Sequence, residues 1–89
     1  MGELMAIQRS AAYGRIVRNP RVLGGEPIVR GTRISVRSVV LAAREFGGPD
    51  GVREAYPHLT ADDVTDALAY YAAHTEEVES HIQANLAEA

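Results

Sequence analysis

Residues 59–71 read LTADDVTDALAYY, and this stretch predicts the central helix of the fold. Its apolar side chains recur at i, i+3, i+4 and i+7, the spacing of one buried helix face, and they are Val64, Ala67, Leu68 and Tyr71. Thr60 precedes them as a hydroxyl N-cap. Asp62 and Asp63 place carboxylates in the first turn, where the helix dipole favours negative charge. We therefore expect a helix that begins at residue 61.

The apolar spacing continues downstream at Val78, Ile82 and Leu86. One long helix over residues 61–87 would accommodate it, and so would a fourth helix capped by Thr75 with carboxylates in its first turn. We expect a break or bend near residues 74–75.

Upstream of the central helix, two shorter helices are indicated. The first has an apolar face that consists of Val36, Val39, Val40 and Ala43. Ser35 is placed to cap it and Gly47 with Gly48 to stop it. The second can open at Pro49 and continue to about Tyr56.

The N-terminal third of the chain has strand and turn signals instead of a helical period. Short β-branched runs bounded by Gly, Pro and Asn predict two strands, at about residues 14–18 and 27–34. We expect an N-terminal arm over residues 1–12, a ribbon with a helix-turn-helix domain over 13–74, and an acidic C-terminal helix over 75–89. The fold class is mainly α, a helix-turn-helix bundle with a short two-stranded N-terminal β ribbon.

Charge is divided unequally between the two halves of the 89-residue chain. Residues 1–45 hold eight Arg and three Glu, whereas residues 46–89 hold one Arg and nine Asp or Glu. Such a division predicts a partner for at least one end. The chain has no Cys and no apolar run long enough to span a bilayer, so we expect a cytoplasmic protein with no membrane association.

Catalysis has little support in the sequence, and we expect neither an enzyme nor a cofactor. His74 and His81 are seven residues apart, on one face if the helix is continuous, where a divalent metal could bind; two solvated histidines are the simpler interpretation, and no metal site is expected. The glycines lack the spacing of a nucleotide-binding loop.

Three helices in this order outline a helix-turn-helix, which makes DNA a candidate partner. The helix in the recognition position carries carboxylates that phosphates would repel. The candidate DNA-binding residues are therefore Arg30, Arg33 and Arg37 on the strands and first helix, with Thr65 as the exposed polar group of the third helix. The competing interpretation is that these arginines form salt bridges with the acidic helices of the same chain.

Two segments, GGEPIVRGTRISV at residues 24–36 and YPHLTADDVTDAL at residues 56–68, resemble the small bacterial family known as domain of unknown function 433. The resemblance spans roughly residues 13–82. It implies a homeodomain-like helix-turn-helix and an antitoxin that neutralises a PIN-type ribonuclease toxin. It also implies a homodimer that binds its own operator DNA as a regulator of transcription.

Two toxin-binding surfaces are compatible with this implied function. An arginine could occupy the carboxylate-rich metal site of the nuclease. Alternatively, the acidic segment 75–89 could cover a basic toxin surface through Val78, Ile82 and Leu86, with glutamates such as Glu79 at the rim, and we favour this second arrangement. The same apolar stripe could instead close the chain's own core or a homodimer. A protein-interaction adaptor without DNA affinity is the alternative function.

Overall fold

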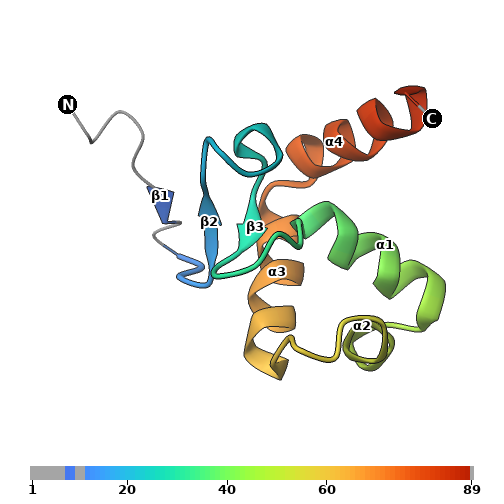
Figure 1. Cartoon of the computed structure of the whole chain (residues 1–89). Helices are drawn as coiled ribbons and strands as arrows, with labels where there is room; N and C mark the ends of the chain where they lie inside the picture. Colours follow the sequence, from blue (N-terminus) through green and yellow to red (C-terminus); the bar gives the residue numbers. More distant parts are fainter. Residues whose placement is uncertain (1–7, 10–11, 89) are drawn as a thin grey trace.

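The computed structural model describes residues 8–9 and 12–88, which form a small sheet and four helices (Figure 1). The elements are β1 (Gln8–Arg9), β2 (Ile16–Arg18), β3 (Ile28–Val29), α1 (Val36–Phe46), α2 (Pro49–Ala55), α3 (Ala61–Ala73) and α4 (Thr75–Glu88). A mainly α fold with a short N-terminal sheet is therefore confirmed. Most of the predicted arm, residues 1–7 and 10–11, lies outside the described residues.

The helix ends follow the local capping signals. The Ser35 hydroxyl oxygen accepts a hydrogen bond from the amide of Ser38, 2.9 Å away, at the start of α1. Thr60 and Asp63 form a reciprocal capping box at the start of α3. The break between α3 and α4 falls at His74, so two helices in place of one long one are confirmed. His74 and His81 consequently do not share a helix face.

The sheet is antiparallel in the order β1-β2-β3. In the β2–β3 pair, Ile16 lies opposite Val29 and Val17 opposite Ile28, which confirms the predicted ribbon. β1 adds a third strand to β2, within the segment that the sequence assigned to an arm.

The strand predicted over residues 27–34 is shorter than expected. β3 ends at Val29 because Gly31, at a φ of +78°, turns the chain back; the Thr32 amide donates to the Val29 carbonyl at 3.0 Å. The Thr32 hydroxyl also donates to that carbonyl, at 2.7 Å, and accepts the Ile34 amide at 2.9 Å. Residues 30–33 are therefore a fixed turn.

One core joins the sheet to all four helices. Its largest buried side chains include Ile16 and Val29 from the sheet, Val36 and Val39 from α1, Val52 from α2, Leu59, Val64 from α3 and Val78 from α4. α4 thus shares its core with the segment 13–74. No helix in the described part of the chain is long and apolar enough to cross a bilayer.

Candidate functional site

The basic and acidic halves of the chain fold against each other, and the first contact is at Arg15. Its guanidinium lies 3.2 Å from an Asp63 carboxylate oxygen and 3.6 Å from one of Asp62. Its backbone amide donates to Asp66 at 3.2 Å. The residue that precedes β2 therefore binds the N-terminal half of α3, and part of the negative charge of α3 is neutralised within the chain.

A second contact joins β2, α3 and α4 through Arg18, Tyr70 and Glu77. Arg18 donates to the Tyr70 hydroxyl oxygen at 2.7 Å, Tyr70 donates to Glu77 at 2.7 Å, and Arg18 also pairs with Glu77 directly. Burial together with the bond to Glu77 raises the pKa of Tyr70 to about 12. Burial alone would raise the pKa of Glu77, but the bonds from Tyr70 and Arg18 outweigh it and hold that pKa below its usual range.

A parallel arrangement of Arg44, Tyr71 and Glu79 joins α1 to α3 and α4. Arg44 donates to the Tyr71 hydroxyl oxygen at 2.9 Å, and both residues donate to Glu79. These bonds hold the pKa of Glu79 below its usual range. Glu79, predicted to lie at the rim of a toxin-binding surface, is therefore already occupied by groups of its own chain.

Arg37 is also occupied. Its guanidinium makes two bonds to Glu26, at 2.8 and 3.3 Å, and the side chains are 16% and 9% exposed. Glu26 thus engages two of the five N–H groups of this guanidinium and holds it at a mostly buried place. That Arg37 contacts DNA stays a prediction.

Arg30 and Arg33 differ from these arginines. Both are exposed on the turn at the end of the ribbon, and neither has an ion-pair or hydrogen-bond partner for its side chain among residues 12–86. The turn lies close to α3: the Arg30 amide donates to the Arg15 carbonyl at 2.7 Å, and Arg15 in turn contacts Asp66. Thr65, next to Asp66 on α3, is exposed as predicted. The structure therefore keeps three of the four DNA-binding candidates accessible.

The apolar stripe of α4 faces inward. Val78 is 0% and Ile82 4% exposed, and both belong to the core, whereas Leu86 is 64% exposed. The assignment of Val78 and Ile82 to a toxin surface is therefore wrong, because they pack against the chain's own helices. The competing interpretation, in which the stripe completes the chain's own core, agrees with the structure.

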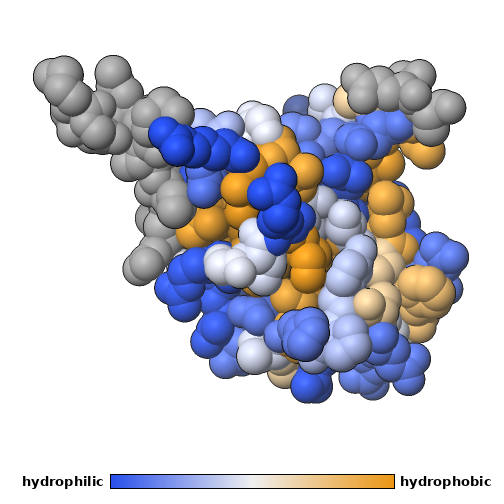
Figure 2. All heavy atoms as spheres, viewed as in Figure 1, coloured by the Kyte–Doolittle hydropathy of each residue, from blue (hydrophilic) through white to orange (hydrophobic). Residues whose placement is uncertain are grey.

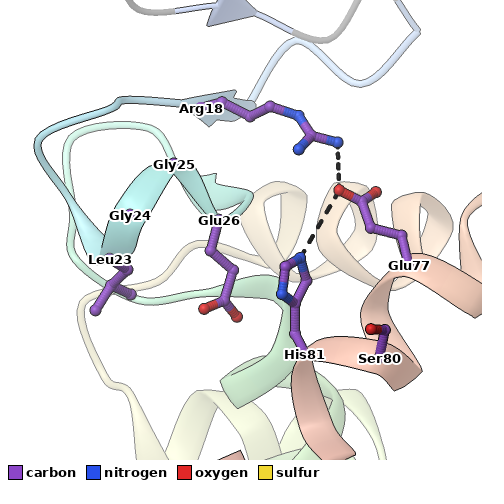
Figure 3. A pocket seen from close by; sticks show the side chains of 8 residues that line it. All are labelled: Arg18, Leu23, Gly24, Gly25, Glu26, Glu77, Ser80 and His81. Atoms are coloured by element: carbon purple, nitrogen blue, oxygen red, sulfur yellow. Dashed lines mark hydrogen bonds and ion pairs between the residues drawn. The ribbon is translucent and has the colours of Figure 1, made fainter. Parts of the chain in front are cut away.

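A hollow of about 300 Å³ lies between α4 and the short turn Leu23–Gly25 (Figure 3). Arg18, Glu77 and His81 point toward one another across it, with the His81 Nε2 atom 3.9 Å from a Glu77 oxygen. That nitrogen is buried and has no hydrogen-bond partner in the part of the chain described. Nothing in the sequence pattern indicated this hollow, because its walls come from segments more than fifty residues apart.

Metal-ligating residues do not gather in the described structure. His74 stacks on Tyr70, with ring centroids 4.3 Å apart, and His81 lies on the next helix. No group of three or more His, Asp or Glu side chains that could hold a metal ion occurs among residues 12–86. The accessible chemistry of the surface is hydrogen bonding and charge.

A family comparison and a structure comparison both point to the same protein family. The family called "Protein of unknown function (DUF433)" matches residues 16–71. The uncharacterized protein y4eO of Sinorhizobium fredii is 34% identical over 61 residues; the match covers 68% of this chain and 28% of y4eO, so the chain spans little more than a quarter of that relative. The crystal structure of a DUF433 member from Anabaena variabilis superposes with a TM-score of 0.67 at 37% identity, covering 78% of this chain and 68% of the other.

Proposed function

The chain belongs to the DUF433 family of proteins of unknown function, and from this premise we propose that it is an antitoxin-like binding protein. In this proposal it carries out no catalysis, neutralises a PIN-type ribonuclease toxin by direct binding, and binds operator DNA as a dimeric autoregulator. The antitoxin association comes from the family resemblance of the sequence. The DNA contact is supported by the surface of this chain.

The proposal that the chain binds DNA rests on one observation. The guanidinium groups of Arg30 and Arg33, on the turn at residues 30–33, are exposed and make no ion pair within residues 12–86. Both side chains project from a backbone that Gly31 and Thr32 fix, so no turn has to be ordered when a phosphate binds. Arginine offers a planar fork that suits phosphate oxygens. Of the five arginines between residues 13 and 35, Arg15 and Arg18 are held by carboxylates. Arg21, Arg30 and Arg33 are exposed and have no ion pair within residues 12–86, and of these Arg30 and Arg33 lie on the fixed turn.

α3, the helix in the recognition position, is poorly suited to bind DNA. Its first turn exposes Asp62, with 77% of that side chain accessible, and Arg15 alone faces three carboxylates there. Phosphates would be repelled at this end of α3. We therefore place the DNA contact at the turn, with Thr65 as the exposed uncharged polar group that α3 adds to it.

The DNA half is tested with labelled upstream DNA by fluorescence anisotropy over a series of salt concentrations. Each phosphate contact contributes about 0.9 to the slope of log K against log salt, so Arg33→Ala should lower the slope by about 0.9 for each copy bound. Arg53→Ala is the matched control, since Arg53 is also exposed and unpaired within the described residues but lies on α2. Equal loss in the two variants would reject the placement on the turn.

The toxin half is tested by co-expression with the product of the neighbouring gene, if that gene encodes a PIN-like nuclease. Rescue of growth by the full chain is the expected result. Removal of residues 75–89 is not an informative variant, because it would remove Val78 and Ile82 from the core. Point substitutions at exposed residues are therefore the appropriate variants, and failure of the full chain to bind the nuclease would reject this half.

An adaptor without DNA affinity is the second candidate. The acidic start of α3 and the net charge of −3 favour it. Absence of DNA binding even at low salt, combined with binding to the nuclease, would establish the adaptor in place of the regulator.

A further inference from the structure

The corner between α1 and α2 presents the only Phe of the chain to solvent. Phe46 is the last residue of α1 and is 54% exposed. Gly51 of α2 approaches it so closely that a Cβ atom at residue 51 would lie 2.1 Å from the Phe46 carbonyl oxygen. The backbone of Phe46 is thus held against α2, and Figure 2 shows apolar surface at the right of the view, over the end of α1.

A hollow of about 200 Å³ lies beside this ring, lined by Phe46, Glu54 and Ala55. It combines an aromatic side chain, a methyl group and a carboxylate. Glu54 is exposed and has no ion-pair or hydrogen-bond partner among the described residues, in contrast to Glu77 and Glu79, which accept bonds from arginines of the same chain. The carboxylate of Glu54 is therefore available to a group from another molecule.

We propose that this hollow receives an arginine or lysine side chain of a protein partner. The aliphatic stem would pack on Phe46 and Ala55, while the cationic head would lie near the aromatic ring and the Glu54 carboxylate. A neutral or anionic side chain would use the apolar wall but leave the carboxylate unpaired.

The surrounding charge favours the same occupant. Glu45 and Asp50 are exposed near the hollow in sequence and unpaired within the described chain, and Arg53 is the single cation of α2. Residues 45–55, which include the lining of the hollow, therefore hold three carboxylates and one arginine, an excess of negative charge that attracts a basic partner and repels nucleic acid.

The inference deepens the proposed function, on which its choice of partner rests. A toxin that cleaves RNA must present basic side chains to RNA phosphates, and the α1–α2 corner would bind one of them. The corner takes the place of the predicted surface on α4, where Val78 and Ile82 lie in the core and Glu79 is occupied.

The first experiment titrates the isotopically labelled full chain with N-acetyl-arginine amide and follows chemical shifts by NMR. N-acetyl-citrulline amide, which is neutral and of similar shape, is the control ligand. The expected result is a set of shifts centred on Phe46, Glu54 and Ala55 with arginine that citrulline does not produce. Equal shifts with both ligands, or shifts confined to other parts of the chain, would overturn the proposal.

The second experiment measures binding of the neighbouring-gene product to the wild-type chain and to Phe46→Ala and Glu54→Gln variants. Loss of an exposed cation–π contact should weaken binding by about two- to fivefold. Glu76→Gln is the matched control, because Glu76 is exposed and unpaired in the described structure but lies on α4. Circular dichroism confirms that each variant is folded.

The experiments distinguish failure of the antitoxin function from failure of the binding site at the α1–α2 corner. Toxin binding that tolerates both corner substitutions as well as the Glu76 control would overturn the corner and leave the antitoxin function standing. No toxin binding by the wild-type chain would reject the antitoxin function, while arginine-specific shifts at Phe46 would still support the chemistry of the hollow.

Discussion

Substitution of Tyr70 by Phe should remove one hydroxyl that holds β2, α3 and α4 together. Tyr70 is 4% exposed, accepts a bond from Arg18 at 2.7 Å and donates one to Glu77 at 2.7 Å. Hydrogen bonds to charged groups contribute about 1.5–3 kcal/mol each. Because Arg18 and Glu77 still pair in the variant, we expect the free energy of unfolding at neutral pH to fall by about 1.5–3 kcal/mol in total.

The same hydroxyl gives this prediction a pH dependence. Burial and the bond to Glu77 raise the pKa of Tyr70 from 10.0 to about 12, so the folded chain holds this proton more tightly than the unfolded chain does. The resulting stabilisation is complete below pH 10 and is lost as the pH rises to 12. Two pKa units correspond to about 2.7 kcal/mol. The stability gap between wild type and Tyr70→Phe should therefore close by about that amount over this range.

The assay is urea unfolding followed by far-UV circular dichroism at a series of pH values from neutral to alkaline. Tyr71→Phe is the control, because Tyr71 makes equivalent bonds to Arg44 and Glu79 at a less buried site than Tyr70 and should show a smaller effect. Absorbance of tyrosinate gives an independent titration, in which one of the four tyrosines should ionise last. Parallel loss of stability in wild type and Tyr70→Phe across the alkaline range would refute the reasoning.

Four further substitutions test the turn, a cap and the orientation of α4. Gly31→Ala places a side chain at a φ of +78°, so chemical denaturation should detect a loss of about 1–2 kcal/mol. Thr60→Ala removes half of the α3 capping box and should lower the free energy of unfolding by about 1 kcal/mol, an idea that an unchanged urea midpoint would contradict. Ile82→Ala should cost about 2–5 kcal/mol. Leu86→Ala, at an exposed position, should change the free energy by less than about 0.5 kcal/mol, and comparable losses at the two sites would reject the inward orientation of α4.

The sequence predicted the helices well because their signals are local. The capping residues Ser35 and Thr60 and the apolar period need only a few neighbouring residues to act, and the helix ends agree with them. The ribbon was harder, because the end of β3 depends on hydrogen bonds that the Thr32 hydroxyl makes in the folded turn. A β-branched run alone does not reveal where such a turn interrupts it.

The site was only partly predictable, because side-chain pairing is not local. Arg15 and Asp63 are separated by 48 residues, and Arg18 and Glu77 by 59. No periodic pattern indicates which arginine meets which carboxylate, so Arg37 could not be told apart from Arg33. An apolar stripe likewise indicates that α4 is buried on one face. It does not specify whether that face packs against the core of the same chain or against a partner protein.

The pairing of the two halves has a consequence for how the chain is made. Synthesis delivers the arginine-rich half first, so Arg15 and Arg18 leave the ribosome before any of the carboxylates that hold them in the folded protein. The first 45 residues hold eight Arg against three Glu, whereas residues 1–74 hold nine Arg against eight Asp or Glu. The core stays incomplete until Val78 and Ile82 of α4 have been added. A chain that lacks α4 would therefore leave Arg18 and Arg44 without the carboxylates of Glu77 and Glu79, and it would expose the core that Val78 and Ile82 complete.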